Sequence, residues 1–278
     1  MNKRMVLIFF ALLCTMLIAP AEAKTWYVDD DGGADFTTIQ SAVNSAYSGD
    51  MIYVYAGTYG DFYVRIPNLS IIGENADVVT VNTISLPEGS RESDYADGTI
   101  LKELKITTSP KIYGAGGAKV SNLVIKDCIF HGINCDLKYG VDTIFENNVI
   151  SNSTGPYALI IRYSCVVANN TIKNNAGSIV LYQAVNTTVE KNHIESNGYG
   201  FYFYNAGEQN KIYLNNIHNN SQIARVKGTI PYITYWNSTT PIKYTYNGQT
   251  YNGYMGNYYS DYTGTDADGN GIGDTPYV

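Results

Sequence analysis

FENNVI at residues 145–150 is one copy of a short pattern that recurs through the middle of the chain. The other copies are IKDCIF (125–130), VANNTI (167–172), VEKNHI (189–194) and IYLNNI (212–217). Each copy has an apolar residue, then an asparagine (a cysteine in IKDCIF) three residues later, and another apolar residue two residues after that. This middle position falls on Cys128, Asn148, Asn170, Asn192 and Asn215, at spacings of 20, 22, 22 and 23 residues. A period this short and regular predicts a solenoid.

The repeat unit favours β-strands over helices. Runs rich in β-branched and aromatic residues, such as YALIIRY (157–163), SIVLYQ (178–183) and GFYFYN (200–205), are interrupted every few residues by Asn and Gly. No unit offers ten residues with a helical period of 3.6. About 22 residues suit three short strands and three turns. The sequence therefore predicts an all-β fold, a single-stranded right-handed parallel β-helix.

The asparagine column has a physical explanation in such a fold. Neighbouring coils of a β-helix stack about 4.8 Å apart, so an Asn at the same turn of each coil can hydrogen bond to the next coil. Asn also tolerates the left-handed backbone of a sharp turn. We therefore expect a structural ladder, although an Asn-lined binding groove is an alternative. The ladder consists of Asn148, Asn170, Asn192 and Asn215.

A helix is expected before the first coil. TTIQSAVNSA (37–46) places Ile39, Ala42 and Val43 on one helical face. Thr37 and Gln40 have the spacing of a capping box, and Gly49 is placed to end the helix. A solenoid exposes apolar surface and strand edges at its ends, so this helix is predicted to cover the N-terminal end.

The sequence changes character after Asn220. PIKYTYNGQTYNGY (241–254) alternates on both sides of Asn247-Gly248, the signature of a type I′ hairpin. Nine tyrosines lie between Tyr232 and Tyr262. The predicted organisation is a signal peptide at 1–23, a β-helix with its N-terminal helical cap at 24–220, and a tyrosine-rich C-terminal cap at 221–278.

The N-terminus has the three parts of a signal peptide. Lys3 and Arg4 precede an apolar run from Met5 to Ile18, and AEA (21–23) fits the small-x-small cleavage rule. An uncleaved anchor helix is the alternative, but the apolar run is short for a membrane span. We expect a mature chain that starts at Lys24, lacks a membrane span after cleavage, and is secreted or displayed on the cell surface.

Charge excludes one class of partner. The chain has 18 basic and 25 acidic residues, a formal net charge of −7, and only 15% charged residues. A nucleic-acid-binding face requires basic residues to neutralise phosphates. Nucleic acid is therefore not an expected partner.

If the chain is exported, its N-glycosylation sequons and its remaining cysteines become open to modification. Asn-x-Ser/Thr sequons permit N-glycosylation, and they occur at Asn68, Asn152, Asn169, Asn186, Asn219 and Asn237. An odd number of cysteines remains after the signal peptide, namely Cys128, Cys135 and Cys165. One disulfide with a free thiol, or three buried thiols, are both open.

DADGNGIGD (266–274) predicts a calcium loop. Asp266, Asp268 and Asn270 occupy positions 1, 3 and 5 of an EF-hand-like loop, the carbonyl of Ile272 position 7, and Asp274 position 9. The usual acidic twelfth ligand is absent, because that position is a tyrosine. The loop follows the repeats, so we expect calcium to act as a structural clamp in the C-terminal cap.

Two stretches carry a family resemblance. DFTTIQSAVNSAYSGDMIYVYAGTY (35–59) resembles the opening of secreted β-helix proteins such as pectin methylesterases and lyases. GNYYSDYTGTDADGNGIGDTPY (256–277) resembles the terminal signature of NosD-type β-helix proteins, which are abundant on archaeal cell surfaces. The repeats resemble those of the carbohydrate-binding and sugar-hydrolase group. The resemblance implies the β-helix fold, with a function that depends on the individual site.

Three functions follow as hypotheses. The first is a non-catalytic protein that binds or organises surface polysaccharide, with sugar stacking on Tyr157, Tyr182, Tyr202 or Tyr204. The alternative is a polysaccharide lyase or hydrolase, which needs acids facing one cleft; Lys126 and Glu146 instead suggest a surface ion pair.

The NosD resemblance implies copper handling as a second alternative, which needs clustered ligands. From their positions in the repeats, we expect no such cluster among His131, His193 and His218.

Overall fold

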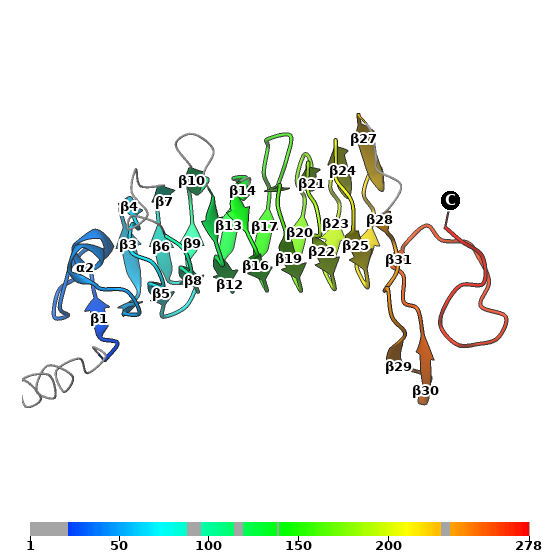
Figure 1. The fold of residues 1–278 in the computed structure, drawn as a ribbon, viewed down its shortest axis with the longest axis horizontal. Coiled ribbons are helices and arrows are strands. Elements are labelled where there is room, and N and C mark those ends of the chain that lie inside the picture. Colours follow the sequence, from blue (N-terminus) through cyan, green and yellow to red (C-terminus); the bar gives the residue numbers. More distant parts are fainter. Residues whose placement is uncertain (1–21, 88–95, 114–118, 138, 229–233, 278) are drawn as a thin grey trace, which may run out of the picture.

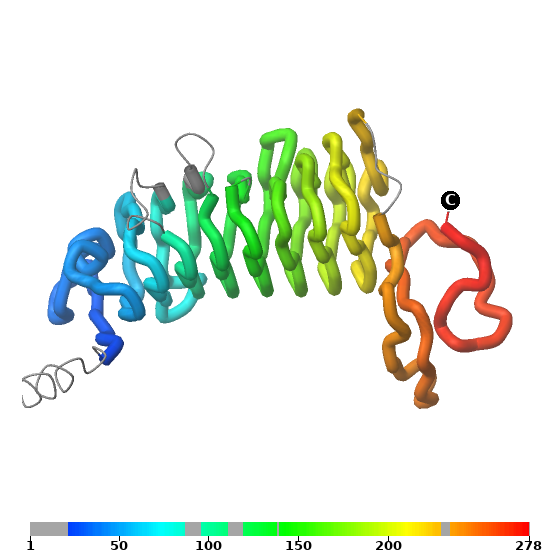
Figure 2. The backbone as a smooth tube through the Cα atoms, viewed as in Figure 1, coloured from blue at the N-terminus to red at the C-terminus, as the bar shows by residue number. Residues whose placement is uncertain are grey.

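The computed structural model describes residues 22–87, 96–113, 119–137, 139–228 and 234–277. The predicted signal peptide lies almost entirely outside this part of the chain. Successive coils stack along one axis, with α2 at one end and the C-terminal hairpin at the other (Figures 1 and 2). The architecture is the predicted parallel β-helix, an all-β solenoid.

Three long parallel sheets run along the axis. The ten-stranded sheet contains β1 (Thr25–Val28), β2 (Met51–Val54), β5 (Ser70–Gly73), β8 (Ile100–Lys102), β12 (Val124–Lys126), β16 (Thr143–Glu146), β19 (Cys165–Ala168), β22 (Thr188–Glu190), β25 (Asn210–Tyr213) and β28 (Thr234–Tyr235). The nine-stranded sheet contains β3 (Gly57–Tyr59), β6 (Val79–Val81), β9 (Lys105–Ile106), β13 (Ile129–His131), β17 (Val149–Ser151), β20 (Thr171–Lys173), β23 (His193–Glu195), β26 (Asn216–His218) and β31 (Tyr258–Tyr259). The five-stranded sheet contains β14 (Cys135–Leu137), β18 (Leu159–Ile161), β21 (Ile179–Tyr182), β24 (Phe201–Tyr204) and β27 (Ala224–Lys227).

Shorter sheets complete the coils. On the N-terminal side, β4 (Phe62–Tyr63), β7 (Ile84–Pro87) and β10 (Lys111–Tyr113) form a three-stranded parallel sheet. A two-stranded parallel sheet joins β11 (Val120–Ser121) and β15 (Gly140–Val141). The antiparallel pair is the hairpin of β29 (Ile242–Tyr246) and β30 (Gln249–Gly253).

The repeated apolar positions form two buried columns. In the ten-stranded sheet, Ile125 pairs with Phe145, which pairs with Val167, and the column continues through Val189 and Ile212. The second column is in the nine-stranded sheet and consists of Phe130, Ile150, Ile172, Ile194 and Ile217. All of these side chains are at most 1% exposed. The predicted alignment of the repeats is therefore confirmed, because burial fixes the register of each strand.

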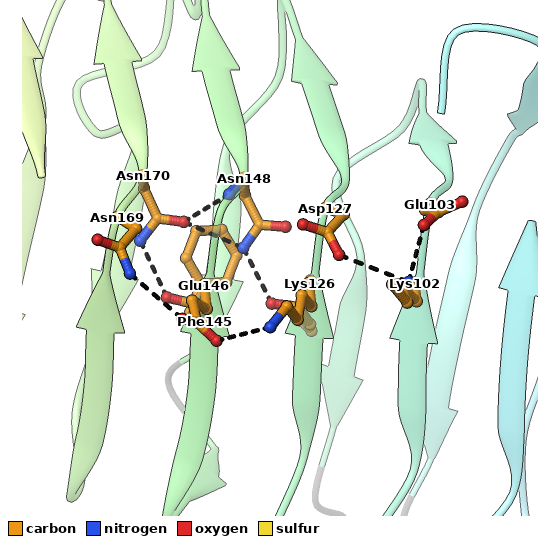
Figure 3. Close-up of polar contacts among 10 residues, drawn as sticks. Lys102, Glu103, Lys126, Asp127, Phe145, Glu146, Asn148, Asn169 and Asn170 are labelled. Carbon is orange, nitrogen blue, oxygen red and sulfur yellow. Dashed lines mark hydrogen bonds and ion pairs between the residues drawn. The ribbon is translucent and has the colours of Figure 1, made fainter. Parts of the chain in front are cut away.

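The asparagine column forms a continuous chain of buried hydrogen bonds between coils. The side chain of Asn170 accepts from the backbone N–H of Asn148 through Oδ1, at 2.8 Å, and donates through Nδ2 to the carbonyl of Phe145, at 2.9 Å. Asn192 makes the equivalent bonds one coil later: its Oδ1 accepts from the backbone N–H of Asn170, and its Nδ2 donates to the carbonyl of Val167. Figure 3 shows Asn148 and Asn170 side by side in adjacent coils. Each amide therefore satisfies backbone groups of the preceding coil, which the turn leaves without strand partners.

The left-handed residues of this turn precede the ladder. Asn147, Asn169, Lys191 and Leu214 each have φ of 56° or 57°, whereas the ladder asparagines that follow them have ordinary backbone angles. The expectation that the ladder residues themselves need positive φ is therefore wrong. Their amides are required for hydrogen bonding, and the sharp turn is made one residue earlier.

A second turn of the coil uses the same device. Ile172, Ile194 and Ile217 are each followed three residues later by an asparagine, and these form a second ladder. In it, Asn175 accepts from the backbone of Ser153 at 2.9 Å, and the column continues through Asn197 and Asn220. The first ladder also extends beyond the repeats, because Asn257 accepts from the backbone of Asn215 at 3.1 Å.

The N-terminal helix is α2 (Ile39–Ser45), and its cap differs from the prediction by one residue. Thr38, rather than Thr37, is the N-cap and accepts from the backbone N–H of Ser41. Gln40 instead reaches the first coils, where Oε1 accepts from the backbone N–H of Tyr63 at 2.8 Å. The helix ends at Ser45, and its C-cap is Ala46 rather than Gly49. Its buried face contacts β1, β2 and β4 at the end of the stack (Figure 1).

The C-terminal region continues the solenoid past Asn220. β27, β28 and β31 each add a strand to one of the three long sheets. The predicted hairpin is confirmed and is inserted between β28 and β31; Asn247 and Gly248 both have positive φ at its turn. Residues 221–278 therefore supply a further coil as well as the hairpin and loop that project from it (Figure 2).

Removing one ladder amide tests its contribution to stability. Asn170→Leu should lower the free energy of unfolding by about 3 kcal/mol, because buried backbone groups lose their partners at about 1–3 kcal/mol each. The matched control is Asn169→Gly, which keeps the left-handed turn and changes an exposed side chain. Urea unfolding measures both variants. Equal stability of Asn170→Leu and the wild type would show that the ladder does not stabilise the stack.

Leu214 provides a test of the turn geometry. It is a leucine at φ +57° in a column where two other coils have asparagine, and left-handed backbone costs most residues about 1–2 kcal/mol. Leu214→Asn should be more stable than Leu214→Ala by about 1 kcal/mol, since both variants remove the same apolar side chain. A urea midpoint for Leu214→Ala at or above that of Leu214→Asn would contradict this explanation.

Candidate functional site

The outer surface of the five-stranded sheet carries the most distinctive side chains of the coils. The alternation of buried and partly exposed residues in β24 turns Phe201 and Phe203 inward and Tyr202 and Tyr204 outward. In-register pairing places Tyr182 of β21 beside Tyr204, and Lys227 of β27 beyond it. We call this surface the tyrosine face; its residues are Tyr157, Arg162, Tyr182, Tyr202, Tyr204, Arg225 and Lys227.

The rings of the tyrosine face form one connected cluster. Tyr182 and Tyr204 stack with ring centroids 4.8 Å apart and planes at 13°. Tyr202 meets Tyr204 edge-on at 6.2 Å and stacks with Tyr157 at 6.5 Å. Behind them, Tyr199 is 7% exposed and donates its hydroxyl to the carbonyl of Pro156. Rings in this arrangement restrain one another, so the surface is preorganised.

Three cations border these rings. The guanidinium of Arg162 lies 5.7 Å from the ring centre of Tyr182, and that of Arg225 lies 5.6 Å from Tyr202. Lys227 Nζ lies 5.2 Å from the ring centre of Tyr204. Arg162 is also held by a 2.8 Å hydrogen bond to Gln183 Oε1. The four strands β18, β21, β24 and β27 contain no acidic residue, so the surface is aromatic and positively charged.

The acids on the outer face of the ten-stranded sheet are paired with lysines. Lys126 Nζ lies 3.1 Å from Glu146 Oε2, which confirms the predicted ion pair (Figure 3). The hydrogen bond from Lys126 holds the pKa of Glu146 below its usual value. Lys102 similarly lies between Glu103 and Asp127. Each of these three carboxylates therefore has a lysine partner in its own or a neighbouring coil.

Two of the three histidines lie closer together than their positions in the repeats suggest. His193 and His218 both approach one carboxylate on the nine-stranded sheet: His193 Nε2 lies 2.9 Å from Glu195 Oε2, and His218 Nδ1 lies 3.7 Å from Glu195 Oε1. The sequence did not suggest this proximity, because the two histidines stand at different positions of their repeats. Parallel pairing brings His218 opposite Glu195 in the next coil. The contact with His193 lowers the pKa of Glu195.

The described residues do not fit a copper site. His131 lies several coils away and contacts Ser151. The three cysteines are free and buried, and burial raises the pKa of Cys128 to about 12. Among the described residues, three metal-binding side chains converge within 4.8 Å at Asp29, Asp30 and Asp31, and this group includes no histidine or cysteine.

That acidic triplet was not anticipated, although DDD at 29–31 is visible in the sequence. Its contacts point to a structural role. Asp30 Oδ2 accepts from the backbone N–H of Thr58 at 2.8 Å, and Asp29 Oδ1 accepts from the backbone of Asp31. A Cβ at Gly57 would lie 2.1 Å from Asp30 Oδ1, so a larger residue there would displace this carboxylate.

The terminal loop is closed by its own side chains. Asp266 Oδ2 accepts from the backbone N–H of Gly271 at 2.8 Å, Asn270 Oδ1 accepts from Ile272, and Asp274 Oδ2 accepts from Ala267. Asp268 accepts from Asn270. The loop also touches the hairpin, where the Tyr251 hydroxyl donates to the carbonyl of Gly269 at 3.2 Å.

The tyrosine at loop position 12 anchors the chain instead of serving as a ligand. The rings of Tyr277 and Tyr259 stack at 4.0 Å. The Tyr277 hydroxyl donates to Asp261 Oδ2 at 3.0 Å. The end of the described chain is therefore attached to β31, the last strand of the nine-stranded sheet.

The sequon asparagines lie where glycans could attach. All six are exposed: Asn68, Asn152, Asn169, Asn186, Asn219 and Asn237. The first five have left-handed backbone angles, a conformation that asparagine adopts more readily than most residues. Among the described residues, no helix is long and apolar enough to span a bilayer.

Comparison with known proteins gives remote structural similarities. A mannuronan C-5 epimerase A-module, AlgE6, from Azotobacter vinelandii is 16% identical with a TM-score of 0.47, over 68% of this chain and 74% of that chain. Pectate lyase Pel9A is 11% identical with a TM-score of 0.49, over 73% and 68%. The catalytic unit of a GH87 α-1,3-glucanase from Streptomyces thermodiastaticus strain HF3-3 is 19% identical with a TM-score of 0.49, over 76% and 42%. These similarities are too remote to support an argument about function.

The family assignment rests on the sequence. No curated protein matches the chain. A family model described as "Periplasmic copper-binding protein (NosD)" matches residues 43–264, which is well over half of the chain. The match spans the coils, the inserted hairpin and the start of the terminal segment. The chain therefore belongs to the NosD family.

Proposed function

We propose that this protein is a secreted or cell-surface β-helix that binds polysaccharide on its tyrosine face without catalysing a reaction. The observation that carries the proposal is the stacked pair of Tyr182 and Tyr204, partly exposed within a connected aromatic cluster. Aromatic rings offer a flat apolar surface, and their hydroxyls can hydrogen bond at the rim. This combination suits a sugar ring, which has an apolar face and polar edges.

The arrangement favours binding over hydrolysis. A glycosidase needs two carboxyls on opposite sides of a bond, whereas the acids on the outer face of the ten-stranded sheet are engaged by lysines of the same or a neighbouring coil. The tyrosine face offers cations and rings but no acid on β18, β21, β24 or β27. A lyase or hydrolase remains the alternative, and turnover of a bound polysaccharide would favour it.

Copper handling is the role that the family description suggests. The described histidines and cysteines do not converge as copper ligands, so we derive no step through this metal. Copper uptake that depends on His193 and His218 would favour this alternative.

A glycan array tests the proposed site. The chain from Lys24 onward should bind a subset of polysaccharides, and Tyr204→Ala should weaken binding about tenfold, equivalent to about 1.4 kcal/mol. Tyr47→Ala is the matched control, since this side chain is 77% exposed and lies beside α2. Equal binding by both variants would place the site elsewhere, and no binding by the wild type would refute the proposal.

We also propose that calcium binds the loop from Asp266 to Asp274. Three carboxylates, one amide oxygen and the carbonyl of Ile272 make an oxygen-rich donor set that suits calcium. Asp268 and Asp274 are exposed, and Asp266 and Asn270 are partly exposed. The loop touches the hairpin through Tyr251. A bound ion would therefore stiffen the loop against the hairpin that projects from the last coil.

Thermal unfolding with and without a chelator measures this effect. Calcium should raise the melting temperature of the wild type, because a ligand at about 100 times its Kd adds about 2.7 kcal/mol to the folded state. Asp268→Ala should remove most of this increase, while Glu208→Ala, an exposed acid in another coil, should retain it. Identical wild-type melting curves in calcium and in chelator would contradict the proposal.

A further inference from the structure

The charge of the tyrosine face is opposite to that of the chain as a whole. The sequence has 25 acidic and 18 basic residues, but β18, β21, β24 and β27 carry Arg225 and Lys227 and no acid. Arg162 directly follows β18 and adds a third cation. Asp136 on β14 is the nearest acid in the same sheet, three strands from β24. A local excess of cations attracts anionic ligands and raises their association rate.

The two cations on β27 are available to a ligand. Lys102 and Lys126 in the ten-stranded sheet, and Lys191 directly after its strand β22, each have a carboxylate within 4.0 Å. By contrast, neither Arg225 nor Lys227 has such a partner among the described residues, and both side chains are exposed. The rings beside them hold these cations in place without neutralising their charge.

The columns of the sheet give the face a direction. One column runs from Tyr182 through Tyr204 to Lys227, and the adjacent column runs from Val180 through Tyr202 to Arg225. Coils repeat about every 4.8 Å, and the stacked rings of Tyr182 and Tyr204 are separated by 4.8 Å. A polymer lying along the solenoid axis would therefore meet rings first and cations next.

Resting on the proposed function, we infer that the ligand of the tyrosine face is an anionic polysaccharide whose carboxylates, like those of uronic acids, bind Arg225 and Lys227. Arginine can hold a carboxylate with two parallel hydrogen bonds. The sugar rings stack on Tyr182, Tyr204 and Tyr202. A neutral polysaccharide would use only the rings and leave the cations unpaired.

Protection of a sheet edge is a second explanation for the cations on β27. β27 is the edge strand of the five-stranded sheet, and all four of its residues are exposed. Charged side chains on an edge strand also prevent pairing with another chain. Edge protection works with either sign of charge, whereas carboxylate binding requires positive charge. Charge reversal therefore distinguishes the two explanations.

The experiment compares polygalacturonate with the same polymer after chemical reduction of its carboxyl groups. Binding to the chain from Lys24 onward is measured by calorimetry at low and high salt. The test variant is Arg225→Glu with Lys227→Glu, and Arg225→Gln with Lys227→Gln is measured alongside it. The matched control is Arg65→Glu with Lys243→Glu, two exposed cations on other parts of the surface. Melting curves identify any variant that fails to fold.

The expected result is that polygalacturonate binds at least about tenfold more tightly than the reduced polymer and binds more weakly at high salt. Both double variants at Arg225 and Lys227 should lose this preference, and the control should keep it. Equal binding of the two polymers would overturn the anionic ligand but leave the proposed function standing. An equal loss in the control would also overturn it, as an unspecific charge effect. If neither polymer binds while the glycan array shows another ligand, only this inference fails; if nothing binds in either experiment, the proposed function fails too.

Discussion

The structure depends on satisfying the backbone groups at each turn between coils. Strands pair with the coils above and below, but a turn leaves N–H and C=O groups without such partners, and buried groups of this kind are costly. Asn148, Asn170, Asn192 and Asn215 meet this requirement with one side chain per coil, each bonding to the coil before it. The second ladder does the same at another turn. Because every coil supplies the partner for its neighbour, the stack is a chain of nearest-neighbour interactions.

Regular stacking also determines what each outer face can present. A position repeated in every coil becomes a column along the axis, so neighbouring residues on a face come from neighbouring repeats. On the ten-stranded sheet, the column that includes Lys126 and Glu146 produces an ion pair. On the five-stranded sheet, the same arrangement stacks Tyr182 on Tyr204 and places Lys227 next to them. The scaffold is shared by the faces, and the difference between the ion-paired surface and the proposed binding surface lies in a few side chains.

Much of the fold could be predicted from the sequence because the repeat is an internal alignment. The columns through Phe145 and Ile150, and the hairpin at Asn247-Gly248, follow from spacing and turn chemistry. What the sequence could not give is the position of the outward residues relative to the neighbouring coil. His218 lies opposite Glu195 only through parallel pairing, and the direction of Tyr202 and Tyr204 depends on the local alternation of β24. The second asparagine ladder was predictable, since Asn175, Asn197 and Asn220 follow the apolar column at constant distance.

In the proposed function, the solenoid is a scaffold for one binding surface. Hydrogen–deuterium exchange of the chain from Lys24 onward, with and without its bound polysaccharide, tests this claim directly. The account predicts increased protection in peptides that cover 179–182, 201–204 and 224–227, with little change on the outer strands of the ten-stranded sheet. Protection confined to the loop at 266–274, or to the nine-stranded sheet around Glu195, would contradict it.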